Sequence, residues 1–241
     1  MKIYKYKDLR PENNRKHFID MVLENSVWCA DPDSLNDEDE FRYKYDYRPT
    51  PHTVILLEEI LKKTISPSSA WKARHVIENG LLQGIAEPII DSLIGKARSE
   101  IGIASFSRFR NKSILWQRYG GNRYGVCIQY VIPDNLIGNT YHNVAYVSEK
   151  VFHIDTFYES YLDNSKVIDS YRNMLLTKTQ SKWKCEAEVR LITSEQKIRQ
   201  PVHGPITEIL FGGNVPDSVY EEMMKSISSH CQQNDIRIAR F

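Results

Sequence analysis

The spacing of hydrophobic residues predicts strands in several parts of the chain. Residues 2–7 alternate, so that Tyr4 and Tyr6 would lie on one face of a strand and Ile3 and Lys5 on the other. Continuous or alternating apolar runs predict further strands, at residues 27–30, 100–107, 124–131, 142–148, 185–193, 206–212 and 236–241. We expect these segments to form one mixed, largely antiparallel sheet.

Apolar residues at intervals of three and four predict the helices. One helix begins near Pro11, and others are expected at residues 53–63, 69–78, 81–97, 114–116, 155–178 and 217–232. Residues 50–98 therefore form a helical insert, while a strand, a helix and a strand between residues 208 and 241 make a βαβ-like unit. The pattern predicts a single α+β domain over residues 1–241, in which helices surround the sheet.

Two carboxylates stand two residues apart at the start of the strand expected at residues 185–193. Side chains alternate along a strand, so Glu186 and Glu188 would share one face, and Ala187 and Val189 the other. Two acids on one face repel each other, and each raises the pKa of the other where water is limited. Such a pair can serve acid–base chemistry or bind a metal. It can also be a solvated strand end whose charges pair with Lys182, Lys184 or Arg190.

Charge is nearly balanced over the whole chain but is concentrated locally. The 32 Lys and Arg residues and the 31 Asp and Glu residues give a net charge of +1, which excludes a general polyanion-binding protein. Between Ile101 and Pro133, however, there is no acidic residue. The same segment contains five basic residues (Arg108, Arg110, Lys112, Arg118 and Arg123), and several of its aromatic residues are interleaved with them (Phe106, Phe109, Trp116, Tyr119 and Tyr124). This mixture suits phosphates and stacked bases, although Trp116 and Tyr119 can also be core residues, with the arginines as a hydrated rim.

Several familiar metal-site patterns are absent from the sequence. An EF-hand loop starting at Asp31 would need an oxygen ligand and then glycine where Leu35 and Asn36 stand. We expect instead a solvated turn in which Asn36 and Asp37 bond to their own backbone. The 4 cysteines lie far apart without a CxxC pair, and the 7 histidines include no HxxxH pair, so no metal ligands are assigned.

The sequence also bears on the location of the protein. Residues 1–7 contain no apolar run typical of a signal peptide, and no stretch of about 18 apolar residues occurs in the chain. We therefore expect a soluble, cytoplasmic protein with no membrane partner.

A series of short motifs resembles the domain-of-unknown-function 2971 family over nearly the whole chain. In chain order, these motifs are Tyr4-Lys5-Tyr6, Asn36-Asp37 with Glu40-Phe41, Ser105-Phe106-Ser107, Trp116-x-x-Tyr119, Gly125-Val126-Cys127-Ile128, Lys182-Trp183-x-x-Glu186-x-Glu188-x-Arg190 and Ile209-Leu210-Phe211-Gly212. The resemblance implies a cytoplasmic bacterial protein of a toxin or anti-phage defence system. An antitoxin or another defence-system protein is then a candidate partner. The resemblance names no reaction.

Three elements also resemble the arginine-serine-glutamate type of ADP-ribosyltransferases. They are Lys5 on the first strand, the serines of Ser105-Phe106-Ser107, and the acids of Glu186-Ala187-Glu188. That family has arginine on the first strand and threonine between the serines, so Lys5 and Phe106 depart from its pattern. The resemblance implies an enzyme that uses NAD as a co-substrate to modify a nucleic acid or a protein. A carboxylate at the ribose would stabilise the oxocarbenium character that develops as nicotinamide leaves.

The same resemblance implies a role for each candidate site residue. Glu188 would bind the ribose hydroxyl and stabilise the transition state, Glu186 would activate the acceptor, and Ser105 would support Glu188. Cofactor binding is implied for Lys5, Tyr6, Arg108, Arg118 and Tyr119. Among these, Arg108 or Arg118 would hold the pyrophosphate, and Tyr119 would stack on nicotinamide.

Two other functions stay open at this point. In a metal-dependent nuclease, Glu186 and Glu188 would bind magnesium together with Asp37 or Glu40. In a protein without catalytic activity, the basic and aromatic segment would bind a nucleotide, a nucleic acid or a phage protein, independently of both glutamates.

Overall fold

The chain folds into two compact units. The computed structural model describes residues 1–40, 42–163 and 166–241. Unit 1 consists of Met1–Ala30, Gly102–Val144 and Gln180–Phe241, and unit 2 consists of Asp31–Ile101 and Ala145–Thr179. Helices and a mixed, mostly antiparallel sheet are both present, which confirms the predicted α+β class. The sequence predicted one domain with a helical insert at residues 50–98; that segment lies in unit 2, together with its flanks and the distant segment 145–179.

A seven-stranded mixed sheet forms the scaffold of unit 1. Its strands, in spatial order, are β13 (Arg237–Arg240), β12 (Ile206–Phe211), β5 (Gly125–Val131), β1 (Lys2–Asp8), β4 (Gly102–Ser107), β10 (Glu188–Thr193) and β6 (Tyr141–Asn143). Neighbouring strands are antiparallel except β12 and β13, which are parallel and are connected by α9 (Asp217–Gln233). The predicted βαβ unit at the end of the sequence is therefore confirmed.

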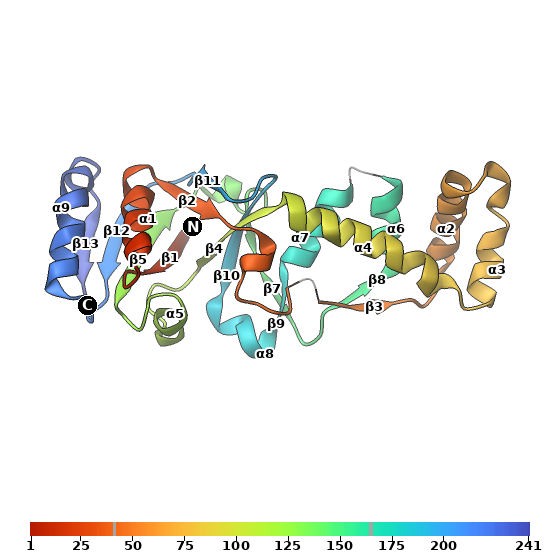
Figure 1. Ribbon diagram of the computed structural model, residues 1–241, viewed down its shortest axis with the longest axis horizontal. Helices are drawn as coiled ribbons and strands as arrows, with labels where there is room; N and C mark the ends of the chain where they lie inside the picture. The colour runs from red at the N-terminus through yellow and green to blue at the C-terminus, as the bar shows by residue number, and fades with distance from the viewer. Residues whose placement is uncertain (41, 164–165) are drawn as a thin grey trace. The chain divides into compact units, whose positions relative to one another are not determined.

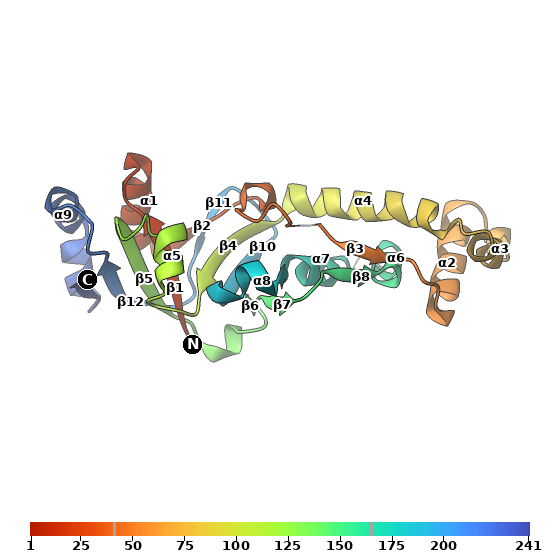
Figure 2. The same ribbon diagram turned by 90° about the horizontal axis from the view of Figure 1, so that it is seen from below.

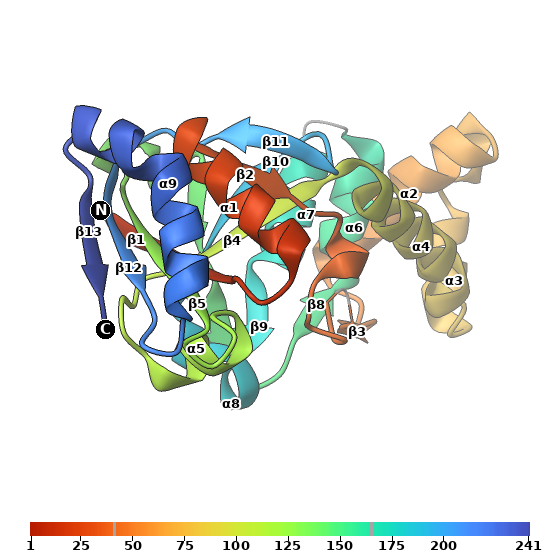
Figure 3. The ribbon, with the colours of Figure 1, turned by 60° about the vertical axis from the view of Figure 1, so that its left-hand side comes forward.

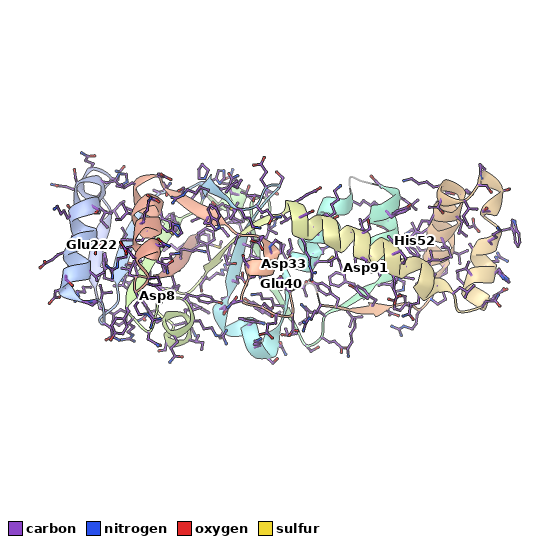
Figure 4. All side chains as sticks on the ribbon, in the orientation of Figure 1. Asp8, Asp33, Glu40, His52, Asp91 and Glu222 are labelled. Carbon is purple, nitrogen blue, oxygen red and sulfur yellow. The ribbon has the colours of Figure 1, made fainter. Side chains whose placement is uncertain are left out.

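Helices α1 (Glu12–Leu23) and α9 cover one face of this sheet. Apolar residues that alternate along the strands, among them Ile3 and Phe106, form one buried core with apolar residues of both helices. In Figure 3 the two helices lie side by side in front of the strands. An ion pair of 3.0 Å joins Arg15 of α1 to Glu222 of α9, the latter labelled in Figure 4. This face, which we call the core face, contains the main hydrophobic core of unit 1.

The opposite face of the sheet carries buried polar groups and is covered in part by α5 (Ser113–Arg118). Trp116 of this helix packs edge-on against Tyr6, with the ring centroids 5.2 Å apart, in a small apolar cluster. Beside this cluster, the hydroxyl of Tyr4 donates a hydrogen bond of 3.1 Å to the side-chain oxygen of Gln129. We call this side the polar face, and the strand register assigns to it Tyr4, Ser105, Ser107, Gln129, Glu188, Arg190 and Glu208.

The strand predicted at residues 27–30 lies outside the seven-stranded sheet, which corrects the expectation of a single sheet. As β2 (Ser26–Cys29), it pairs antiparallel with β11 (Ile198–Pro201), and Ala30 then bridges to Ile103 of β4. β11 was not predicted, because its sequence contains one large apolar residue and no alternation. The 3-10 turn η3 (Asp134–Leu136) follows β5 in the same unit.

Unit 2 is mainly helical. Its helices are α2 (Pro51–Thr64), α3 (Lys72–Glu78), α4 (Leu82–Glu100), α6 (Ile154–Leu162) and α7 (Val167–Leu175), and Figures 1 and 2 show α4 running alongside α6 and α7. Two short parallel strand pairs accompany them, β3 (Lys44–Asp46) with β8 (Val151–His153) and β7 (Ala145–Val147) with β9 (Thr177–Thr179). The 3-10 turns η1 (Pro32–Ser34) and η2 (Pro67–Ser69) also belong to this unit.

Two elements predicted as continuous are divided in the structure. The prediction of one continuous helix at residues 155–178 is wrong, because this range contains α6, α7 and the start of β9. Residues 164–165 of the prediction lie outside the described part of the chain. Asp163 ends α6 because its backbone is extended, with φ −127° and ψ 104°. The strand expected at residues 142–148 is likewise two strands, β6 and β7, separated by Val144.

The acidic loop of unit 2 forms the predicted turn, and Asn36 is exposed as expected, but two of its acids are buried. The backbone N–H of Asp39 donates to Oδ1 of Asp37 at 3.1 Å, and that of Glu40 donates to the carbonyl oxygen of Asp37 at 2.9 Å. Asp37 therefore bonds to its own backbone, as expected. However, Asp37 is only 4% exposed and Glu40, labelled in Figure 4, only 6%. The prediction of a solvated turn is wrong for these two side chains.

Replacing Phe211 with alanine is expected to destabilise the protein by about 3–5 kcal/mol. Phe211 of β12 is fully buried, and its ring lies edge-on to Phe18 of α1 and Tyr220 of α9 at centroid distances of 5.9 and 4.9 Å. Alanine would leave a cavity between the sheet and both helices. Urea unfolding followed by circular dichroism measures the loss. Tyr124→Ala, which removes a ring that is 40% exposed, is the matched control and should cost less than about 1 kcal/mol; equal losses would contradict this view of the core.

Candidate functional site

Glu186 and Glu188 lie in different elements, because the strand begins later than predicted. Glu186 is the last residue of the 3-10 turn η5 (Lys184–Glu186), which follows α8 (Gln180–Trp183), and β10 begins at Glu188. Between the two acids, Ala187 has left-handed backbone angles of φ 43° and ψ 55°. The prediction that Glu186 and Glu188 share one face of a strand is therefore wrong, since the left-handed residue interrupts the alternation.

Ser107, at the end of β4, holds this turn against the neighbouring strand. Its hydroxyl donates a hydrogen bond of 2.6 Å to the backbone carbonyl oxygen of Glu186. The backbone N–H of Arg108 donates to the carbonyl oxygen of Ala187 at 3.0 Å. Glu188 stands opposite Ser107 in the register of β4 and β10. Ser107 thus bonds to the backbone of Glu186 and stands opposite Glu188 in the sheet.

Ser105, the serine that the resemblance implied, has a different neighbour. It stands opposite Arg190, two residues further along β10, and its backbone carbonyl accepts a hydrogen bond of 2.8 Å from Nζ of Lys5. Because Ser105 and Ser107 alternate with Phe106, both serines lie on the polar face, and only the strand register distinguishes them. The sequence contains the Ser105-Phe106-Ser107 motif, but the serine that stands beside Glu188 is Ser107 and not Ser105.

The Glu186 carboxylate is buried and accepts hydrogen bonds from two side chains. Nη1 of Arg118 and the hydroxyl of Tyr119 donate to its Oε1 at 2.8 and 2.7 Å. Glu186 is 4% exposed, whereas the Arg118 side chain is 28% exposed and its guanidinium lies 5.0 Å from the ring centroid of Trp183. Although partial burial opposes its charge, the hydrogen bond to Glu186 raises the pKa of Arg118. The structure therefore brings three predicted site residues together at one carboxylate.

Glu188 forms an ion pair with Arg190 on the same strand and the same face. Nε of Arg190 lies 2.7 Å from Oε1 of Glu188, and its Nη2 lies 3.4 Å from Oε2. The two residues are 4% and 0% exposed, so the pair is almost entirely removed from water. His142 of β6 stands opposite Arg190 in the strand register and is also buried. Arg190 was one of the partners considered for the acids, but the solvated strand end assumed with it is wrong.

Lys5 and Tyr6 project from opposite faces of β1. Lys5 stands opposite Ile128 on the core face, and its Nζ lies 5.5 Å from the ring centroid of Phe106. Tyr6 lies on the polar face, where its hydroxyl donates a hydrogen bond of 2.8 Å to the backbone carbonyl oxygen of Phe109 and its ring packs on α5. The residues predicted to bind one cofactor are therefore divided between the two faces, and Tyr6 serves the packing of α5.

Arg108 and Arg110 have different surroundings, although they are two residues apart. Arg108 is exposed to solvent. Arg110 binds the carboxylate of Glu208 through two hydrogen bonds, from Nε to Oε2 at 2.7 Å and from Nη2 to Oε1 at 2.8 Å. Glu208 was not among the predicted site residues, although an acid within the apolar run of β12 was an available signal.

Metal ligands, membrane-spanning helices and related proteins give no further guide to the function of this site. Within residues 1–40, 42–163 and 166–241, no three or more His, Cys, Asp and Glu side chains are grouped so as to hold a metal ion. Among the helices described, none is both long and apolar enough to cross a membrane. Comparisons with models of protein families, with curated proteins and with solved structures find no match to this chain. Its function must therefore be inferred from the site itself.

Replacing Arg190 with methionine is expected to destabilise the protein by about 3–5 kcal/mol, because the carboxylate of Glu188 would stay buried without its guanidinium. The double variant Arg190→Met with Glu188→Gln removes both charges and should recover part of this loss. Urea unfolding of the wild type, both single variants and the double variant gives the coupling energy. Additive effects of the two changes would show that the ion pair does not couple these residues.

Replacing Lys5 with methionine is expected to change how stability depends on pH. Burial, followed by the like charge of Lys7, lowers the pKa of Lys5 from 10.5 to about 8. Between these values the unfolded chain binds more protons than the folded protein, so the contribution of Lys5 makes stability rise with pH through this window. Below it, the full cost of burying the charge applies.

The Lys5→Met variant should therefore be more stable than the wild type at pH 7, by on the order of 1–3 kcal/mol. This advantage should shrink as the pH approaches 10.5, the unfolded-state pKa of the lysine. Urea unfolding at a series of pH values from 7 to 10 measures the difference. Lys16→Met, at an exposed position of α1, is the control and should show no such trend. A constant difference between wild type and Lys5→Met would be inconsistent with a buried, titrating ammonium group.

Proposed function

We propose that this chain is an ADP-ribosyltransferase-like enzyme that uses NAD to modify an acceptor. The observation that carries the proposal is the order of three strands. β1 with Lys5, β4 with Ser105 and Ser107, and β10 with Glu188 are consecutive neighbours in the sheet. The serines and Glu188 lie on the polar face, whereas Lys5 lies on the core face and reaches the backbone carbonyl oxygen of Ser105. These strands are far apart in the chain, so their adjacency does not follow from sequence order. It supports the assignment because the transferase resemblance rests on residues of these same three strands.

The charges at the site suit a reaction in which NAD loses nicotinamide. The bond between ribose C1′ and the nicotinamide nitrogen breaks, both bonding electrons leave with nicotinamide, and positive charge develops on the ribose. Glu188, held on the polar face by Arg190, would supply the negative charge that stabilises this centre. Arg118, which keeps part of its side chain exposed, would bind the pyrophosphate.

Glu186 is the proposed base for the acceptor. As an acceptor atom bonds to C1′, its proton would pass to the Glu186 carboxylate, which Arg118 and Tyr119 orient through their hydrogen bonds. Ser107 takes the positioning role that the sequence resemblance gave to Ser105, since it fixes the turn between the two acids. Tyr119 is assigned to orienting Glu186, because its hydroxyl already bonds that carboxylate.

Glu188→Gln is expected to lower the release of nicotinamide from NAD by at least about 100-fold, the scale of losing a main electrostatic stabiliser. Labelled NAD is incubated with the protein and candidate RNA, DNA and protein acceptors, and both nicotinamide release and label transfer are measured. Glu208→Gln is the matched control, because Glu208 is an equally buried acid on the polar face, paired with Arg110. It should leave the release of nicotinamide without an acceptor unchanged, because Glu208 pairs with Arg110 of the loop at residues 108–112.

Two further variants separate chemistry from folding. Glu188→Asp keeps a charge for Arg190, so it should unfold near the wild-type temperature and still lose most of the turnover. Glu186→Gln should lose transfer to the acceptor while NAD hydrolysis to ADP-ribose continues. No nicotinamide release by the wild type with any acceptor, or equal release by Glu188→Gln, would show that the proposed reaction is wrong.

A further inference from the structure

The loop of residues 108–112 presents an exposed aromatic ring among basic side chains. Phe109 is 37% exposed, and Nζ of Lys112 lies 4.5 Å from its ring centroid. Arg108, the neighbouring residue, is exposed as well. We call residues 108–112 the cation–aromatic loop. A phenylalanine that the core does not bury leaves a π-face available to a ligand.

The backbone of this loop is fixed at several points. The hydroxyl of Ser107 accepts a hydrogen bond of 3.0 Å from the N–H of Phe109, whose carbonyl oxygen accepts one of 2.8 Å from the hydroxyl of Tyr6. The thiol of Cys127 contacts the carbonyl oxygen of Arg110 at 3.6 Å, and the side chain of Arg110 is held by Glu208. The ring of Phe109 therefore extends from a positioned backbone, which lowers the entropy cost of binding on it.

A second pair of the same kind borders α5. The guanidinium of Arg123 lies 4.4 Å from the ring centroid of Phe241, which is 46% exposed. The same ring lies edge-on to Trp116 of α5, with the centroids 6.0 Å apart. Two exposed rings, each with a cation over it, are thus connected to α5: Phe109 precedes the helix in the chain, and Phe241 packs on its Trp116.

We infer that the cation–aromatic loop, with the Arg123 and Phe241 pair, binds single-stranded nucleic acid. Basic side chains beside exposed rings offer contacts to phosphates and stacking surfaces to bases. The whole chain carries only +1, so charge complementarity with a polyanion must be local. Arg110 and Arg118 pair with Glu208 and Glu186, and the cations that the inference uses are therefore Arg108, Lys112 and Arg123. A duplex is disfavoured because its bases are already stacked on each other. An acidic protein could also pair with the cations, and its displacement by an oligonucleotide distinguishes the two ligands.

This surface adjoins the proposed active site through the backbone. The N–H of Arg108 donates to the carbonyl oxygen of Ala187, the residue between Glu186 and Glu188. A strand bound on the loop would therefore lie next to both acids, which identifies nucleic acid as the acceptor class. That identification rests on the proposed function. Nucleic-acid binding does not depend on that function, because it is measured without NAD. A failure of binding is therefore distinguishable from a failure of the proposed reaction.

Fluorescence polarisation of labelled 12-nucleotide oligouridine and oligothymidine, without NAD, tests the stacking contribution. Phe109→Ala should weaken binding about tenfold or more, the range for losing one base stacked on an aromatic ring, whereas Phe109→Tyr keeps the ring and should bind like the wild type. An abasic strand of the same length offers phosphates without bases. Its binding should be weaker and should not change with Phe109→Ala.

The charge contribution is tested by the salt dependence of the same binding. Arg108→Ala and Lys112→Ala should each reduce the slope of log K against log salt by about 0.7, the value for one phosphate contact of a single strand. Lys16→Ala, an exposed lysine on α1, is the charge-matched control and should leave the slope unchanged.

Three results would overturn the inference. One is the absence of binding to both oligonucleotides at low salt, and another is binding that Phe109→Ala leaves intact. The third is a partner protein that binds the loop and is not displaced by either oligonucleotide. Different affinities for the two oligonucleotides would support binding, and oligodeoxyuridine measured beside them separates the effect of the 2′-hydroxyl from that of the thymine methyl group.

Discussion

The hydrogen bond from the Ser107 hydroxyl to the carbonyl oxygen of Glu186 joins the segments on which the candidate site depends. It lies where Ala187 takes a left-handed conformation, which costs a residue with a Cβ about 1–2 kcal/mol. A second bond, from the N–H of Arg108 to the carbonyl oxygen of Ala187, closes the same turn. These two bonds offset the cost of the strained residue. As a result, Glu186 lies outside the strand and accepts hydrogen bonds from Arg118 and Tyr119, while Glu188 is the first residue of β10.

The two faces of the sheet bury different kinds of side chain. Under α1 and α9 the strands bury apolar residues, which is the usual source of stability. The polar face instead buries Glu188 with Arg190, and Glu208 with Arg110. Replacing a buried ion pair by well-packed apolar residues is often neutral or stabilising, so stability alone does not account for these charges. The contrast within one sheet favours a functional reason for the charged groups on the polar face.

The sequence pattern predicted where strands occur but not how they are paired or interrupted. Alternation is visible wherever one face is apolar, and β1, β5 and β12 lie within one residue of their predicted bounds. Glu186 was placed on a strand because Glu-x-Glu continues the alternation and alanine carries no signal for a left-handed turn. Ser105 and Ser107 are equivalent in a local pattern. Their different partners arise from register with a strand about 80 residues away, which local periodicity does not encode.

The arginines explain how two acids can lie beside a surface that suits an anion. Two carboxylates alone would repel phosphates, but Glu186 is bonded to Arg118 and Glu188 to Arg190, while the exposed loop of residues 108–112 is basic. A polyanion would therefore meet positive charge first and the carboxylates only at the reacting atoms. Arg118 is half of one ion pair and is still partly exposed. Under the proposed reaction, a pyrophosphate that engages Arg118 would compete with Glu186 for that guanidinium, so that binding of one substrate opens the carboxylate to the other.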